Sequence, residues 1–236
     1  MVKGLYEAGN HLYSRMRSIQ IVANNLANIN TTAYKREIPF SEIIARTENQ
    51  QNSQITDFTS GALTETNNPL DLAISGHGLF MVKTDNGVEL TSNGKFSISD
   101  EGFLVNEDGN KVMSKNGEIN INEALINAKD KLTITTNGEI KIGEVLIDQL
   151  MVADVRDQSM LERTSSQNFR MLNGEIPVAD ESTYEIHQGY VEESNVNPIL
   201  EMQAMIQINK DFEASQKVVN SLDTIMGRAA QEIGKV

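Results

Sequence analysis

The sequence predicts an α+β protein in which an N-terminal and a C-terminal helix pair as a coiled-coil-like helical domain and enclose a mainly-β meander domain. Two patterns predict this fold. Near both ends of the chain, apolar residues recur at alternating steps of four and three, which places them on one face of a helix. Between the ends, short apolar runs alternate with Asn-Gly and Asp-Gly pairs, which are typical of β hairpins.

The first helix is predicted from about Leu5 to Asn28. An Asn-rich stretch, residues 24–30, overlaps and follows its end, and Asn favours helix ends and turns. We use the word seam for the row of residues along a helix that faces a partner helix. The predicted seam of the first helix consists of Leu5, Gly9, Leu12, Met16, Ile19, Ala23 and Leu26.

The last helix is predicted from Pro198 to about Ile233. Asn197 can cap its N-terminus, and proline is favoured at the first helical position. The predicted seam of this helix consists of Met205, Ile208, Phe212, Ser215, Val219, Leu222, Met226, Ala229 and Ile233.

Apolar residues also lie off the C-terminal seam. A helical hairpin within one chain would explain why the two helices pair, but it would leave these residues uncovered. We therefore favour packing between subunits, in which neighbouring copies cover them. The off-seam residues are Ile199, Met202, Ile206, Val218 and Ile225.

The middle of the chain reads as short strands. Glycines at 87, 94, 102, 109 and 117 recur every seven or eight residues, and their Asn-Gly and Asp-Gly pairs favour type I′ turns. Val145 to Val155 is the longest apolar run, so we expect a central strand there. The predicted strands include Leu79–Thr84, Val88–Thr91, Lys95–Ile98, Lys111–Met113 and Leu132–Thr135, with a helical turn in Asn122–Ala128. The expected divisions are 1–36 for the N-terminal helix, 37–69 for an extended connector arm, 70–188 for the β-rich domain and 189–236 for the C-terminal helix.

The composition of the 236 residues excludes several classes of function. A net charge of -13 would repel phosphate backbones, so we expect no nucleic-acid partner. The chain has no cysteine and therefore no disulfide or thiolate metal site. No apolar stretch approaches the ~20 residues that span a bilayer, and residues 1–16 lack a hydrophobic signal core. We therefore expect neither membrane insertion nor a cleaved signal peptide.

No catalytic, cofactor-binding or metal-binding motif stands out. His11, His77 and His187 share no ligand spacing, and Gly76-His77-Gly78 fails as a dinucleotide fingerprint because Met81 occupies the place of the third glycine. A turn between strands explains that segment better. The 33 carboxylates leave a glycosidase-like pair open, although most acidic residues simply contact solvent. We expect a protein that is not an enzyme and takes no small-molecule substrate.

Several sequence blocks resemble the flagellar rod and hook proteins of bacteria. Ala23 to Asn28 (ANNLAN), followed by Thr32 to Lys35 (TAYK), is similar to the N-terminal signature, in which Gly usually occupies the place of Ala33. Asn68 to Ile74 and Gly189 to Val196 resemble later blocks in the same order. The signature residues are Asn24, Asn25, Leu26, Asn28, Thr32, Tyr34, Lys35, Pro69, Leu70, Asp71, Gly189, Glu193, Ser194, Asn195 and Val196.

The resemblance implies an axial subunit of the basal-body rod in the periplasm. Such a subunit would assemble with itself and with other rod and hook subunits through its terminal helices, around an export channel, after passing through the flagellar export apparatus without a cleaved signal. The short segment from Lys35 to Asn68 favours the proximal rod protein over the distal rod protein, which usually has an extra segment there. A periplasmic hydrolase acting on peptidoglycan and a free-standing surface-binding β module are the alternatives from other classes.

Overall fold

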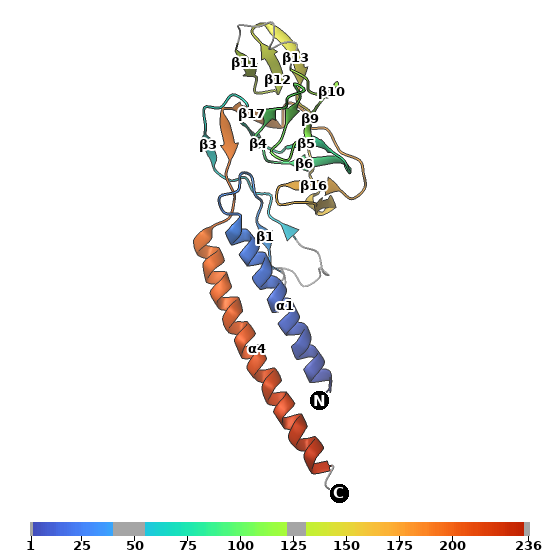
Figure 1. The fold of residues 1–236 in the computed structure, drawn as a ribbon, viewed down its shortest axis with the longest axis vertical. Coiled ribbons are helices and arrows are strands. Elements are labelled where there is room, and N and C mark those ends of the chain that lie inside the picture. Colours follow the sequence, from blue (N-terminus) through green and yellow to red (C-terminus); the bar gives the residue numbers. More distant parts are fainter. Residues whose placement is uncertain (1, 40–54, 122–130, 234–236) are drawn as a thin grey trace. The chain divides into compact units, whose positions relative to one another are not determined.

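The computed structural model describes residues 2–39, 55–121 and 131–233, which form two compact units (Figure 1). The helical unit comprises Met1–Ile29, Arg36–Asp57 and Val196–Val236. The β-rich unit comprises Asn30–Lys35 and Phe58–Asn195. The α+β class is confirmed, with a helix near each end of the chain and mainly β structure between them.

Two long helices, α1 (Val2–Ala27) and α4 (Pro198–Ile233), lie side by side in the helical unit (Figure 1). They run antiparallel, because the contact of Arg15 with Asp211 lies ten residues back along α1 and ten residues further along α4 from the contact of Asn25 with Glu201. α4 has 36 residues and α1 has 26, and the C-terminal end of α4 extends beyond the N-terminal end of α1 (Figure 1).

The start of α4 is capped as the sequence predicts. The Asn197 side-chain oxygen accepts hydrogen bonds from the amides of Ile199 at 3.0 Å and Leu200 at 3.2 Å. These amides have no partner within the helix, and an Asn cap supplies one. Pro198 occupies the first helical position, where its missing N–H costs nothing.

A short ribbon completes the helical unit. β1 (Glu37–Ile38) pairs antiparallel with β2 (Ile55–Thr56), and β1 contacts α1. The two ends of the expected connector arm therefore meet in the helical unit. Residues 40–54 of that arm lie outside the described residues.

The seam predicted for α4 is the face that α4 turns towards α1. Ile208 is buried, and the other seam residues from Met205 to Met226 are half-buried, whereas most neighbouring positions are exposed. The side chains of Ala229 and Ile233 lie outside the described residues.

The face that α1 turns towards α4 differs from the predicted seam. Gly9, Met16 and Ala23 are exposed. The covered row also steps by four and three, but it includes polar and small residues, so the apolar pattern combined two neighbouring rows. This inner row consists of Ala8, Leu12, Arg15, Ile19, Val22 and Leu26. The Leu5 side chain lies outside the described residues.

The β-rich unit is built from short strands. The bounds are β3 (Leu63–Glu65), β4 (Leu72–Gly76), β5 (Leu79–Thr84), β6 (Gly87–Thr91), β7 (Ser97–Ile98), β8 (Leu104–Val105), β9 (Lys111–Ser114), β10 (Gly117–Glu118), β11 (Leu132–Ile134), β12 (Glu139–Ile142), β13 (Val145–Gln149), β14 (Val152–Ala153), a 3₁₀ turn (Gln158–Met160), β15 (Leu161–Arg163), β16 (Asn168–Met171), β17 (Tyr184–Gln188) and β18 (Tyr190–Glu192). The turn between β4 and β5 contains Gly76-His77-Gly78, as expected.

The strand order is only partly that of a meander. Neighbours in sequence pair in β5–β6 and in β11–β12–β13, but the main sheet runs β15-β16-β6-β5-β9-β8-β7, with β10 on β9 and β14 on β5. β17 returns to pair with β4, and β18 pairs with β3. Strands from late in the chain therefore close the unit, and all printed pairs are antiparallel.

The tight turns are not the predicted type I′ turns. Thr84 pairs with Gly87 and Ser114 pairs with Gly117, so each glycine begins the returning strand. A type I′ turn needs positive φ at both central residues, and among the described residues only Ala33 and Asn67 are non-glycine residues with positive φ. The glycines take the left-handed conformation instead, with φ of 117° at Gly87 and 123° at Gly117.

The expected central strand from Val145 to Val155 is also wrong. The segment divides into β13, which pairs with β12 at one end of a three-stranded sheet, and β14, which pairs with β5 in the main sheet. Leu150 lies between them, and its amide donates to the Gly138 carbonyl at 2.9 Å. The expected helical turn in Asn122–Ala128 lies outside the described residues, apart from Ile121 before it.

Apolar side chains cover both faces of β5. Phe80 and Val82 face the larger core, whereas Leu79 and Met81 face a second core. This alternation follows from the two-residue period of a strand. β5 is therefore the centre of the unit.

Candidate assembly surface

The helical unit leaves apolar side chains of α4 uncovered. Val218 and Ile225 are each 55% exposed, on a different side of the helix from the row that contacts α1. The first two turns of α4 carry a second group, Ile199, Leu200, Met202 and Ile206, all exposed. Apolar groups gathered on one surface favour contact with a partner.

α1 also has an uncovered apolar face. Tyr6 is 70% exposed, Tyr13 66% and Met16 45%. The predicted seam residues Gly9 and Ala23 lie on this same face. Each helix of the pair therefore has one face against its partner and further apolar positions open to solvent.

A buried polar junction fixes the end of α1. The Asn25 side-chain amide donates to the Glu37 carbonyl at 2.8 Å and to the Glu201 carboxylate at 3.1 Å, and its oxygen accepts from the Glu37 amide at 2.9 Å. Arg36 Nε donates to Glu201 Oε1 at 2.5 Å. Both Asn25 and Glu201 are fully buried. The junction ties α1, β1 and α4 together.

A second buried ion pair lies in the β-rich unit. Lys35 Nζ donates to Glu192 Oε1 at 2.8 Å, and both side chains are about 95% buried. The Thr59 carbonyl accepts a further bond from Lys35 at 3.2 Å, and the Gly61 amide donates to Glu192 at 2.7 Å. This pair attaches residues 30–35 to β18.

Arg163 holds the same segment from the other side. Its guanidinium lies 5.0 Å from the Tyr34 ring centroid and 4.9 Å from that of Phe169, and one terminal nitrogen donates to the Lys35 carbonyl at 2.5 Å. The Gln167 amide donates to the Thr32 carbonyl at 3.2 Å. Tyr34 itself is buried. Arginine stacked between aromatic rings favours a fixed geometry.

Ala33 adopts the left-handed conformation with φ of 54°, although it is not glycine. Its amide donates to the Glu192 carbonyl at 2.8 Å, and its side chain is buried. The turn that glycine usually provides is therefore kept, at a backbone cost of roughly 1–2 kcal/mol.

The later signature residues serve local contacts in the β-rich unit. The Asp71 carboxylate accepts from the Asn68 amide at 2.9 Å, and the Gly189 amide donates to the Asp71 carbonyl at 2.8 Å. The Asn195 amide donates to the Thr59 carbonyl at 2.9 Å, and Glu193 accepts from the Thr64 hydroxyl at 2.5 Å. Leu70 packs against the larger core and the Pro69 carbonyl accepts from Gln188. In the helical unit, Val196 is buried, Leu26 and Asn28 are half-buried, and Asn24 is exposed.

The sequence missed most partners in these contacts. Glu201 lies in the first turn of a helix, where acidic residues usually face solvent, and Arg163 belongs to no motif. Glu192 stands within the Gly189 to Val196 block, but nothing local marks it as buried. The Asn cluster was the one available signal, because it predicted a helix end.

The described residues show little that resembles a substrate site. Lys35, His77 and Glu192 line a cavity of about 50 Å³, below the range of ordinary ligand pockets. An open recess of about 460 Å³ is lined by Glu162 and Arg170, which pair with each other at 2.8 Å. Within the described ranges there is no cluster of three metal-ligating side chains.

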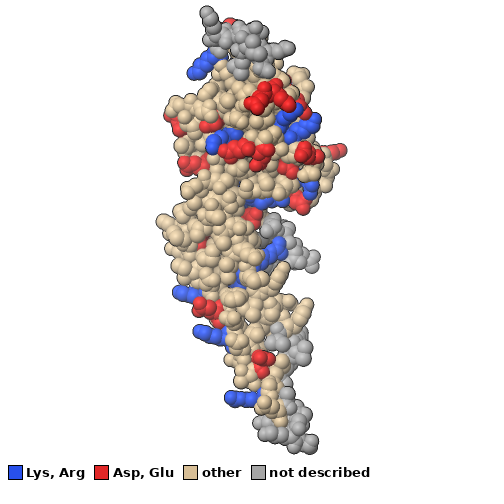
Figure 2. Space-filling model, viewed as in Figure 1, with Lys and Arg blue, Asp and Glu red and all other residues tan. Residues whose placement is uncertain are grey.

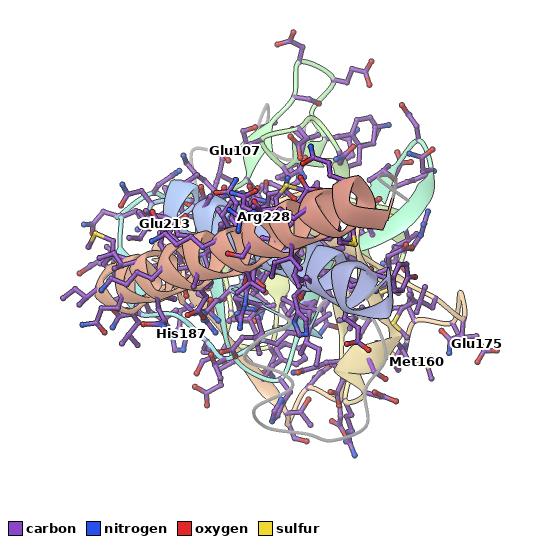
Figure 3. The ribbon with its side chains drawn as sticks, turned by 90° about the horizontal axis from the view of Figure 1, so that it is seen from below. Glu107, Met160, Glu175, His187, Glu213 and Arg228 are labelled. Carbon is purple, nitrogen blue, oxygen red and sulfur yellow. The ribbon has the colours of Figure 1, made fainter. Side chains whose placement is uncertain are left out.

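The three histidines lie in separate places. His11 is an exposed residue of α1, and His77 lies in the turn after β4. His187, labelled in Figure 3, belongs to β17 and lies with its ring centroid 6.2 Å from that of Tyr190. Among the helices that the structure describes, none is long and apolar enough to cross a membrane.

Charge is distributed unevenly between the two units. Residues 30–35 and 58–195 contain 11 Lys or Arg and 23 Asp or Glu, a difference of -12 out of the net -13. Figure 2 shows charged side chains crowded over the β-rich unit and fewer on the helical unit. The helical unit is therefore close to neutral, although α4 carries exposed charges such as Glu213 and Arg228 (Figure 3).

These features define a structural subunit whose surfaces suit contact with other subunits. Two family models match the chain: the flagellar hook protein FlgE/F/G D1 domain over residues 73–142, and the flagellar basal body rod FlgEFG protein C-terminal region over residues 187–232. The second match covers β18 and most of α4.

Full-length relatives agree with the family models. The flagellar basal-body rod protein FlgF of Caulobacter vibrioides is 29% identical over 255 aligned positions, which cover 100% of both chains. FlgF of Rhizobium meliloti is 27% identical over 99% of both chains. The flagellar basal-body rod protein FlgG of Agrobacterium fabrum is 29% identical over 94% of this chain and 96% of that protein. The chain belongs to the family of flagellar basal-body rod proteins, whose members are structural subunits and not enzymes.

Proposed function

We propose that this chain is an axial subunit of the flagellar basal-body rod, which assembles with copies of itself and with other rod and hook subunits through α1 and α4. The observation that supports this most directly is the apolar surface left on the helical unit, with Val218 and Ile225 each 55% exposed. A chain that worked alone would gain from polar residues at these positions.

The assembled subunits would form a hollow rod in the periplasm that transmits torque and whose terminal helices line the export channel. The subunit would arrive through the flagellar export apparatus without a cleaved signal. The buried ion pair of Lys35 with Glu192 and the junction at Asn25 supply rigidity suited to a load-bearing part.

Within the rod we assign the chain to the proximal segment. The stretch between Lys35 and Asn68 is short, and relatives named FlgF align along 99–100% of their length. The distal position is the second candidate, because proteins named FlgG align along 96–100% of theirs.

An exchange on the exposed face of α4 tests the assembly. Ile225→Asp places a carboxylate on the apolar face, while Thr224→Asp adds the same charge at the next exposed position. Because both sites are exposed, both variants should keep their circular dichroism spectra. In a host that lacks its own copy, Ile225→Asp should abolish swimming and incorporation into basal bodies, since burying an unpaired charge costs several kcal/mol.

The control decides how the result is interpreted. Thr224→Asp should swim and copurify with basal bodies. If Ile225→Asp swims equally well, the α4 face is not an assembly surface. Digestion of peptidoglycan by the purified chain would instead favour the hydrolase alternative.

A further inference from the structure

α1 carries a second row of residues with helix-packing spacing, and this row is exposed. Its members step by three and four from Tyr6 to Ala27, the same spacing as the inner row that contacts α4. Residues with this spacing share one face of a helix. We call the row the outer α1 seam; it consists of Tyr6, Gly9, Tyr13, Met16, Gln20, Ala23 and Ala27.

The other two sides of α1 are already occupied. α4 covers the inner row, and β1 contacts α1 near Asn25, where two hydrogen bonds join it to Glu37. Ser18 and Ile21 are buried as well. The exposure of the outer seam is therefore confined to one face, and all of its residues are exposed along more than five turns of the helix.

The residue types suit a helical partner. Tyr13 and Met16 offer large side chains, while Gly9, Ala23 and Ala27 leave hollows between them. Knobs from a partner helix fill such hollows, which form between residues spaced by three and four. A flat or extended partner would leave the hollows empty and forfeit those contacts.

The uncovered positions of α4 complement this seam. Ile206, Val218 and Ile225 are 57%, 55% and 55% exposed, and they are branched aliphatic side chains. One contact between the α1 face and an α4 face would cover both apolar surfaces. α4 also extends past α1 within one chain, so its last turns are open to a neighbouring helix (Figure 1).

Symmetry decides between α4 and α1 as the occupant. A contact of α1 with α1 would be the same on both copies and would close as a dimer, whereas a contact of α1 with α4 leaves a free surface at each end and can continue from copy to copy. Resting on the proposed function in a rod, we propose that the outer α1 seam docks against α4 of a second copy of this chain.

Cysteine cross-linking tests this contact without background, because the chain has no cysteine. Cells that lack their own copy would co-express Tyr13→Cys with either Ile206→Cys or Val218→Cys, which are all exposed positions. Isolated basal bodies would then be treated with a short bis-maleimide. The matched control replaces Tyr13→Cys by Asn10→Cys, an exposed α1 position outside the seam.

The expected result is a band at twice the 26.1 kDa of one copy with at least one of the two α4 partners, and loss of that band with Asn10→Cys. A dimer formed by Tyr13→Cys alone would overturn the proposal in favour of an α1–α1 contact. A cross-link to a protein of another mass, or no cross-link at all, would also overturn it while leaving the rod function intact. If the chain is absent from basal bodies, the proposed function fails and the inference fails with it.

Discussion

Asn25 and Glu201 lie 176 residues apart in the chain, yet the Asn25 amide donates to the Glu201 carboxylate at 3.1 Å. Both residues are fully buried, and Glu201 is also held by Arg36. The end of the first helix, the β1 strand and the start of the last helix therefore share one hydrogen-bonded centre. A buried network of this kind stabilises the structure only while each member keeps its partners.

Asn25→Ala should destabilise the helical unit by about 2–4 kcal/mol, because it removes three hydrogen bonds from buried groups, one of them charged. Denaturant unfolding followed by far-UV circular dichroism measures this. The matched control is Asn24→Ala, since Asn24 is an exposed neighbour. Equal losses for the two variants would show that the junction contributes nothing.

Lys35→Met should cost the β-rich unit about 3–5 kcal/mol, because it leaves the Glu192 carboxylate buried without its cation. Adding Glu192→Gln should recover part of that loss. Lys115→Met breaks an ion pair with Glu181 whose side chains are each 46% exposed, and it should cost at most about 1 kcal/mol. Thermal unfolding of the four variants checks the order, and a similar loss for both lysines would contradict it.

Ala33→Gly should leave stability nearly unchanged, because relief of about 1 kcal/mol of backbone strain is offset by a more flexible unfolded chain. Ala33→Val should cost about 2–4 kcal/mol, since a β-branched residue resists positive φ and the site is buried. Unfolding midpoints of the two variants measure the difference. If Val is tolerated as well as Gly, the turn is not held in the left-handed conformation.

Acid should weaken the β-rich unit through Glu118. Hydrogen bonds from Lys111 and Lys83, at 2.8 and 2.7 Å, hold the pKa of the Glu118 carboxyl below its usual value. A lowered pKa in the folded state contributes stability above the unfolded pKa of about 4.3, and this contribution is lost as pH falls through the lower folded value.

The stability difference between the parent chain and Glu118→Gln should therefore shrink as the pH falls through that range. Denaturant midpoints at several pH values measure it. Glu175→Gln is the control, because Glu175 is exposed (Figure 3) and makes no ion pair within the described ranges. A difference that stays constant with pH for Glu118→Gln would contradict the prediction.

Local structure was largely predictable from the sequence because its causes are local. α4 begins at Pro198 and ends at Ile233, as the cap and the apolar period indicate. β5 spans Leu79–Thr84 as predicted, and β9 and β11 lie within one residue of the expected bounds. The turn type failed because Asn-Gly pairs fit two kinds of turn, and only the strand register distinguishes them.

The long-range contacts were not predictable for a physical reason. The partners of Asn25 and Lys35 lie 176 and 157 residues away, and a single Glu carries no sign of its burial. The row of α1 that faces α4 was mixed with the outer seam because both rows share one spacing. Leu12 belongs to the first row and Met16 to the second, and only the fold separates them.

The uneven charge has a consequence for the ionic conditions of polymerisation. With -12 of the net -13 on the β-rich unit, like units of neighbouring copies would repel one another over roughly 10 Å in dilute buffer, the screening distance near 0.1 M salt. Apolar helix contacts are not weakened by that screening. Raising the salt concentration should therefore speed association of the purified subunit, and a polymer formed at high salt should loosen on dialysis into low salt.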